Sequence, residues 1–144
     1  MKHTETERAV GYLVKRVQQS LRRSCDAALK PTGLSMAQYA VLRALADHPE
    51  ASASELARLC FVTRQSLQDV LGGLRASGLV EPAQSPPKGR AQALRLTSSG
   101  RQRLTASDAA VWRVQAAMLQ GIPLTRRREL AVLLTACADN LETA

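Results

Sequence analysis

The sequence predicts a mainly α-helical fold with one small β-hairpin, an α+β fold. The chain has 144 residues, of which 45% are hydrophobic, so it can bury one domain-sized core. Only 3% of the residues are aromatic, so Leu, Val and Ala must build most of that core. This composition favours packed helices over sheets, which are usually rich in aromatic and β-branched residues.

The first predicted element is a long helix over residues 5 to about 30. Apolar residues recur at helical spacing from Val10 to Leu29, and Pro31 and Gly33 close the pattern. Many of its polar positions are basic. A helix of this length at the end of a small chain often packs on something outside its own core.

Two capping boxes predict the next two helices. Ser35 with Gln38 opens a helix that ends near Asp47, and Ser52 with Glu55 opens a shorter one that continues to about residue 60. In each box the hydroxyl accepts from a free backbone amide of the first turn, and the longer side chain reaches back to the cap. The next cap, Thr63, follows three residues after this helix, so a tight turn must separate the helix that Ser52 opens from the one that comes after it.

The stretch TRQSLQDVLGGLRASGLV, residues 63–80, predicts a helix with one buried face. Apolar residues at positions 67, 70, 71 and 74 form the buried stripe, Thr63 can cap the start, and Gly78 stands just past the end. Together with the preceding helix it forms a helix-turn-helix. Gly72 and Gly73 indicate either a closely approaching neighbour or a simple loss of helix stability, and we favour close packing.

A β-hairpin follows directly. Residues 79–83 read as one strand, residues 85–90 as a loop, and apolar residues at 91, 93, 94 and 96 as the returning strand. A hairpin in this position is a wing. Thr97 then caps a long helix that continues to Leu119, and after a break at 121–123 a final helix starts at Thr125.

The charge distribution points to a polyanionic partner. The formal net charge is +8, from 20 basic and 12 acidic residues, and no acidic residue lies between Glu81 and Asp108, a segment that holds five basic ones. Neutralising phosphates with such residues releases counterions, which favours nucleic acid as the partner. On charge alone, a solvated basic surface that aids solubility is an equal alternative.

Several other classes of protein do not fit the sequence. No apolar run is long enough to span a bilayer and the N-terminus lacks the apolar core of a secretory signal, so we expect a soluble, cytoplasmic protein without a membrane partner. Three widely spaced Cys and two His suggest a reducing compartment and predict no metal site and no cofactor. The chain also lacks a Gly-rich phosphate loop and an obvious catalytic constellation, so we expect that it is not an enzyme.

The order of these elements resembles the MarR family of bacterial transcriptional regulators over essentially the whole chain. The most specific parts are the ELA…GLV helix-turn-helix and the returning strand Arg-Ala-x-x-Leu-x-Leu-Thr-x-x-Gly, residues 90–100. The resemblance implies a single domain over 1–144, with dimerisation helices at 5–34 and 98–144 and a winged helix-turn-helix at 35–97. It further implies a homodimeric repressor that binds double-stranded DNA at a pseudo-palindromic operator.

The resemblance also implies which residues contact DNA. In this family the second helix of the motif lies in the major groove, and here its outward residues are Thr63, Arg64, Gln65, Ser66, Gln68 and Asp69. Arg can pair with guanine, Gln with adenine, and Asp can accept from cytosine, while hydroxyls and free amides at a helix start suit phosphates.

The predicted wing residues are Lys88, Arg90 and Arg95. Arg90 matches the Arg that enters the minor groove in the family. Ser85 and Lys88 stand where Asp is common and would orient that Arg, so this wing departs from the family pattern. Lys88 can add a phosphate contact in its place.

Many relatives release DNA when a small aromatic anion binds between the dimerisation and DNA-binding lobes. The candidates for such an effector pocket are Tyr12, Arg16, Tyr39 and Trp112. The stronger alternative for the three aromatic residues is packing in the core or in an interface.

Two further hypotheses compete with a ligand-released repressor. Cys25 follows Arg22 and Arg23, whose charge could lower its pKa, so the chain could instead be an oxidant-sensing regulator. Cys60 and Cys137 fall on apolar stripes and are predicted to behave as small hydrophobes. The other alternative is a winged helix that serves protein contacts without binding DNA.

Overall fold

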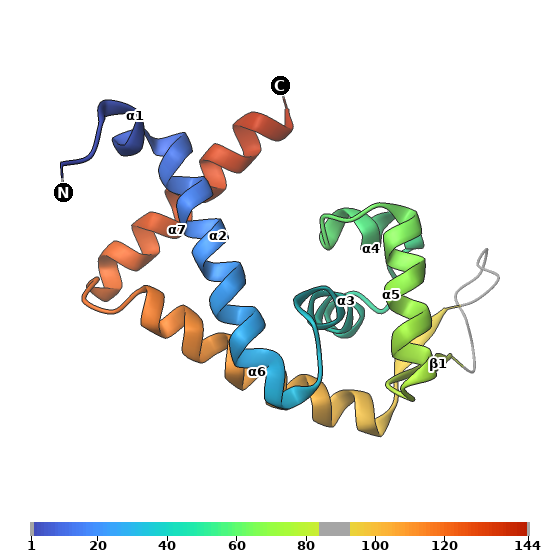
Figure 1. The fold of residues 1–144 in the computed structure, drawn as a ribbon. Helices are drawn as coiled ribbons and strands as arrows, with labels where there is room; N and C mark the ends of the chain where they lie inside the picture. Colours follow the sequence, from blue (N-terminus) through green and yellow to red (C-terminus); the bar gives the residue numbers. More distant parts are fainter. Residues whose placement is uncertain (1, 84–92, 144) are drawn as a thin grey trace. The chain divides into compact units, whose positions relative to one another are not determined.

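The computed structural model describes residues 2–83 and 93–143. The chain divides into two compact units, Met1–Val114 and Gln115–Ala144. The elements, in chain order, are α1 (Glu5–Arg8), α2 (Val10–Leu29), the 3-10 helix η1 (Lys30–Thr32), α3 (Met36–Asp47), α4 (Ala53–Leu59), α5 (Arg64–Ala76), β1 (Val80–Pro82), β2 (Leu94–Leu96), α6 (Ser98–Met118) and α7 (Leu124–Glu142) (Figure 1). The predicted helical fold with one small hairpin is confirmed.

The predicted first helix is two helices. A capping box of Thr4 and Glu7 starts the four-residue α1, and Ala9 then adopts an extended backbone, with φ −67° and ψ 143°. This conformation interrupts the helical hydrogen bonds, and α2 restarts at Val10 without a side-chain cap. The predicted end is confirmed, because Gly33 has φ 75° and caps η1.

The capping boxes of α3 and α4 are present as predicted. The Ser35 hydroxyl accepts from the Gln38 amide at 3.1 Å, and the Ser52 hydroxyl accepts from the Glu55 amide at 3.2 Å. These caps fix the starts of both helices, so that each turns its apolar face toward the common core.

The core of the first unit is aliphatic, as the composition predicts. Leu29, Leu42, Leu67, Leu74 and Leu79 are almost completely buried. They come from α2, α3, α5 and the start of the hairpin, and α5 lies beside both α3 and β1 (Figure 1). The helix-turn-helix is thus held on α3 by one shared apolar cluster.

The hairpin is antiparallel, and it pairs Val80 with Leu96 and Glu81 with Arg95. The predicted loop at 85–90 and Ala91 lie outside the described residues. Thr97 joins the hairpin to its neighbours, because its hydroxyl donates to the Gly78 carbonyl at 2.7 Å and accepts from the Gly100 amide at 3.0 Å. The predicted cap of α6 is therefore confirmed.

Gly100 allows the first turn of α6 to touch the hairpin backbone. A Cβ at this position would lie 2.0 Å from the Leu79 carbonyl oxygen, which no other residue type could accommodate without a backbone shift. This close approach gives a physical reason for the glycine at the end of the Thr-x-x-Gly sequence.

The second unit contains the end of α6, a turn and α7. Gly121 turns the chain with φ 82°, and α7 begins at Leu124, one residue before the predicted start. The Arg127 guanidinium donates to the Ile122 carbonyl at 2.7 Å and so fastens the turn to α7. None of the residues described in α7 is buried in the single chain.

Candidate nucleic-acid interface

Helix α5 presents a capped start and an outward polar face. The Thr63 hydroxyl accepts from the Ser66 amide at 3.0 Å and donates to the Ser66 hydroxyl at the same distance. Thr63 therefore satisfies one of the free amides that a helix start leaves unpaired. The cap fixes where the first turn of α5 begins, and so where the side chains of this turn project.

The six residues predicted on this helix are all exposed, whereas Leu67, Leu71 and Leu74 are buried on the opposite face. The structure thus brings the predicted side chains onto one face. Gln65 Nε2 donates to Asp69 Oδ1 at 3.2 Å, one turn further along. This contact orients the Gln65 amide and leaves the second Asp69 oxygen available as an acceptor.

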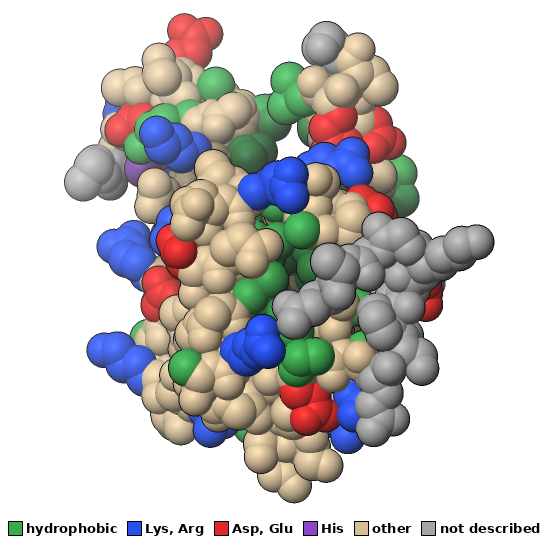
Figure 2. Space-filling view, turned by 90° about the vertical axis from the view of Figure 1, so that its right-hand side faces the viewer, with side chains coloured by type: hydrophobic (Ala, Val, Ile, Leu, Met, Phe, Trp, Pro, Cys, Tyr) green, Lys and Arg blue, Asp and Glu red, His purple; other side chains and the backbone are tan. Residues whose placement is uncertain are grey.

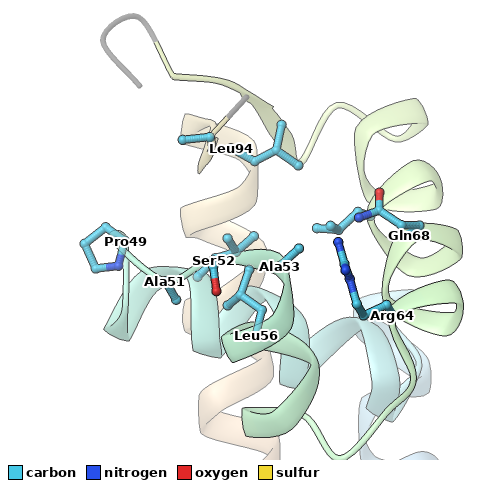
Figure 3. Close-up of a pocket in the computed structure, with 11 residues that line it drawn as sticks. Pro49, Ala51, Ser52, Ala53, Leu56, Arg64, Gln68 and Leu94 are labelled. Carbon is cyan, nitrogen blue, oxygen red and sulfur yellow. The ribbon is translucent and has the colours of Figure 1, made fainter. Parts of the chain in front are cut away.

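The face of α5 borders a pocket of about 400 Å³. In Figure 3, Arg64 and Gln68 extend from α5 along one side of the pocket, while Ser52 and Ala53 at the start of α4 lie across from them. Leu94 of β2 borders the same pocket. Two of the six predicted side chains, Arg64 and Gln68, therefore share one concave surface with the returning strand of the hairpin.

The wing residues are only partly described. Lys88 and Arg90 lie outside the described residues. Arg95 stands opposite Glu81 in the hairpin, and its Nε donates to Glu81 Oε1 at 3.1 Å. Both side chains are half exposed, so the pair is a surface contact that holds the guanidinium in place at little energetic gain.

On the face that Figure 2 presents, the described basic side chains do not form a single patch. Figure 2 shows Lys and Arg spread over the face that it presents, with acidic side chains between them. In this view, charge alone does not mark a binding surface. The polar face of α5 is the more specific feature.

The prediction of close packing at both helical glycines is wrong. A Cβ added at Gly72 would meet nothing within 4 Å, and one at Gly73 would make an ordinary 3.7 Å contact with the Gln38 amide. Neither position requires a glycine for packing, so the alternative, a loss of helix stability, fits Gly72.

The effector-pocket candidates have different surroundings. Tyr39 is buried, and its hydroxyl donates to Asp108 Oδ1 at 2.7 Å. Burial, together with the bond to the Asp108 carboxylate, raises the pKa of the Tyr39 hydroxyl. Tyr12, Arg16 and Trp112 are exposed. For Tyr39 this is the packing that the alternative hypothesis predicts.

Sequence reasoning missed the acid that organises this region. Asp108 of α6 also accepts from the Arg43 guanidinium at 2.6 Å, and Arg43 makes two further hydrogen bonds to Asp47. The carboxylate thus joins two side chains of α3 to α6. The spacing in sequence between Tyr39 and Asp108 gives no local signal of this contact.

Cys25 does not meet the requirements of a reactive thiol, so that prediction is wrong. Its side chain is buried in the first unit, and burial, with a smaller contribution from the negative charge of Asp26, raises its pKa. Arg22 and Arg23 are exposed and do not overcome this burial. Cys60 is half-buried, as a small hydrophobe would be, and burial raises its pKa too. Cys137 is exposed in the single chain, on a helix in which no described residue is buried.

Two other features are absent from the part of the chain that the structure describes. No group of three or more His, Cys, Asp or Glu side chains could hold a metal ion. No described helix is both long and apolar enough to cross a membrane.

Comparison with known proteins gives consistent matches. The family model described as "MarR family" matches residues 32–91. The HTH-type transcriptional repressor Rv2887 of Mycobacterium tuberculosis is 35% identical over 125 residues, which cover 87% of this chain and 90% of the relative. The HTH-type transcriptional repressor IacR of Pseudomonas putida is 24% identical over 132 residues, covering 92% of this chain and 79% of the relative.

Solved structures of the mycobacterial relative superpose on most of the chain. Its complex with DNA matches with a TM-score of 0.73 and 32% identity over 90% of this chain and 97% of that one. Its complex with salicylic acid matches with a TM-score of 0.74 and 34% identity over 90% of this chain and 96% of that one.

Proposed function

Since this chain belongs to the MarR family, we propose that it is a transcriptional repressor that binds specific sequences of double-stranded DNA as a homodimer. The observation that carries the proposal is the face of α5, whose capped start and exposed hydrogen-bonding side chains lie opposite a fully apolar face. A helix of this kind suits the major groove, where base edges offer distinct patterns of donors and acceptors.

The side chains of α5 divide into two roles. Arg64 and Gln68, which border the pocket, are the proposed base readers, since they can pair with guanine and adenine respectively. Gln65 and Asp69 read a neighbouring base as a hydrogen-bonded pair. Thr63 and Ser66 hold the helix start, where free backbone amides and hydroxyls suit phosphate oxygens.

The wing completes the proposed DNA contact. Arg90 remains the proposed minor-groove residue, and Lys88 a proposed phosphate contact. Arg95 is proposed to use the nitrogens that Glu81 leaves free for a phosphate oxygen. The winged helix-turn-helix is proposed to span residues 35–97, all of which fall within the first compact unit.

We propose that a second copy of the chain packs against the terminal helices and buries their exposed apolar residues. Helix α7 exposes Leu130, Val132, Leu133 and Leu134, and the first half of α2 exposes a further apolar row. Large apolar areas of this kind mark interfaces. We therefore assign residues 5–34 and 98–144 to dimerisation. Two recognition helices about 34 Å apart would read half-sites separated by about 10 bp.

A small aromatic anion is the proposed effector. The complex of the mycobacterial relative with salicylic acid supports this class of ligand. In this chain Arg16 would pair with the carboxylate and Tyr12 and Trp112 would offer exposed rings for stacking. Tyr39 would border the ligand only from the core side, through its link to Asp108. Because the family regulates transcription, we propose no enzymatic activity.

The first test is selection of bound duplexes from a random DNA pool, followed by titration of the selected site over a salt series. We expect an inverted repeat, with an affinity that falls steeply as salt rises, because phosphate contacts release counterions. The absence of an enriched sequence for folded protein would reject DNA recognition and favour a protein-interaction role. Release of the selected duplex by salicylate would support the effector proposal, and unchanged binding would reject that effector.

The second test examines base reading by Gln68. Gln68→Ala should relax the preference at one base position by about 1 to 3 kcal/mol, because only the amide discriminates that base. Gln18→Ala, which removes another exposed amide, on α2, is the matched control and should leave the preference unchanged. A uniform loss over all sequences would make Gln68 a phosphate contact instead.

A further inference from the structure

Phe61 combines two unfavourable features in the turn between α4 and α5. Its side chain is 91% exposed, more than any other large hydrophobic side chain that the structure describes. Its φ of 57° is also the only positive value at a non-glycine residue among the described positions. Bulky residues avoid this left-handed region because their Cβ crowds the backbone.

The backbone hydrogen bonds at the end of α4 explain why residue 61 adopts a left-handed conformation. They do not explain why the residue at this position carries an aromatic ring. The Phe61 amide donates to the Arg58 carbonyl and the Val62 amide to the Ala57 carbonyl, which is the Schellman arrangement that ends a helix. The residue in its left-handed position is usually glycine.

The same arrangement at the end of α5 supplies an internal comparison. There the Gly78 amide donates to the Arg75 carbonyl and the Leu79 amide to the Leu74 carbonyl. Gly78 occupies the left-handed position with φ 73° and no side-chain penalty. The chain therefore uses glycine for this position at one end of the helix-turn-helix and an exposed phenylalanine at the other.

The position of Phe61 indicates what its ring contacts. It lies two residues before Thr63, the cap of α5, and the side chains that follow, Thr63, Arg64 and Gln65, are exposed and polar. The ring can make favourable contacts with an apolar group of a partner, while the neighbouring polar and basic side chains can contact anionic groups. A matching partner therefore carries both kinds of group close together. DNA offers both, with phosphates beside deoxyribose rings and thymine methyl groups.

We propose that the Phe61 ring makes an apolar contact with DNA at the edge of the major groove, against a thymine methyl group or a deoxyribose. The inference rests on the proposed function and adds a specificity residue to it. The ring gives up no internal packing to make this contact, because it is exposed in the free protein. The left-handed turn holds the ring outside the α4–α5 core.

The test uses Phe61→Gly, because glycine adopts this backbone freely and only the ring is lost. We expect an unchanged or higher melting temperature and an affinity for the selected operator that is lower by about fivefold or more. Phe61→Tyr keeps the ring and should retain most of the affinity. A Phe61→Gly variant that folds and binds as tightly as the wild type overturns the contact.

Changes in the operator DNA distinguish a contact with a thymine methyl group from a contact with a deoxyribose. Each thymine of the operator is replaced in turn by deoxyuridine, which lacks only the methyl group. If one replacement weakens the wild type and not Phe61→Gly, the ring contacts that methyl. If no replacement matters while Phe61→Gly still binds more weakly, the ring contacts a sugar. If the wild type selects no duplex at all, the proposed function fails together with the contact.

Discussion

At the scale of single residues, Asp108 is a carboxylate with two strong partners from one helix. It accepts from the Tyr39 hydroxyl and the Arg43 guanidinium, and both donors belong to α3. A hydrogen bond that involves a charged group contributes more than a neutral one, and losing one partner leaves a partly buried donor unsatisfied. Asp108 therefore fixes the distance between α3 and the first half of α6.

We expect Asp108→Asn to lower the free energy of unfolding by about 1 to 3 kcal/mol, because the amide keeps the shape and loses the charge that pairs with Arg43. Urea denaturation measures this change. Asp26→Asn, at an exposed position on α2, should change stability by less than about 0.5 kcal/mol. Equal midpoints for Asp108→Asn and the wild type would show that the pair contributes nothing.

Two glycines allow a matched test of close approach. Gly100→Ala should destabilise by about 1 to 3 kcal/mol or prevent folding, since the new Cβ would collide with the Leu79 carbonyl. Gly72→Ala should stabilise by about 0.5 to 1 kcal/mol, because the same methyl enters open space within a helix. Melting temperatures of the two variants should move in opposite directions. A shift of the same sign in both would contradict the packing around Gly100.

At the scale of secondary-structure elements, the sequence predicts best where a side chain makes a local contact. The caps at Ser35, Ser52 and Thr63 lie within three residues of their partners, so their spacing alone locates three helix starts. The break at Ala9 involves no such side chain and was not predicted. The prediction of a reactive thiol at Cys25 was wrong for a related reason, since the burial of this residue depends on the packing of helices distant in sequence.

Substitutions at Thr63 and Ser35 distinguish the contribution of a helix cap to stability from its proposed contribution to DNA binding. Thr63→Ala and Ser35→Ala should each lower stability by about 1 kcal/mol, because each removes the acceptor for one helix-start amide. Only Thr63→Ala should also weaken operator binding at a temperature where both variants are folded. Equal operator affinity for both variants would remove the start of α5 from the proposed interface.

At the scale of the whole molecule, the exposed polar face that we propose reads DNA could be predicted from the sequence, because the single helix α5 supplies all of it. The periodicity of α5 separates buried from exposed positions, and the structure agrees at Leu67, Leu71 and Leu74. The pocket could not be predicted, since its lining comes from α3, α4, α5 and the region of β2. The Tyr39–Asp108 contact could not be predicted either, because it joins residues from two helices that are distant in sequence.

The exposed apolar face of α7 predicts an obligatory partner copy. Leu133→Glu should convert the proposed dimer to a monomer, because it would place a charge in the proposed apolar interface. Operator affinity should also fall in this variant, because a monomer contacts one half-site whereas a dimer contacts two at once. Size-exclusion chromatography with light scattering measures the mass. Thr125→Glu, a polar position in the first turn of α7, should leave the dimer intact, and a Leu133→Glu variant that stays dimeric would place the interface elsewhere.

Because none of the residues described in α7 is buried in the single chain, the lifetime of the protein should depend on how much of it is present. Below the concentration at which copies pair, the terminal helices would lose their cover, unfold locally and become open to proteases. Above it, mass action protects them, so the melting temperature should rise with protein concentration. A repressor built in this way would be cleared faster as it is diluted by cell growth, which would sharpen the return to transcription.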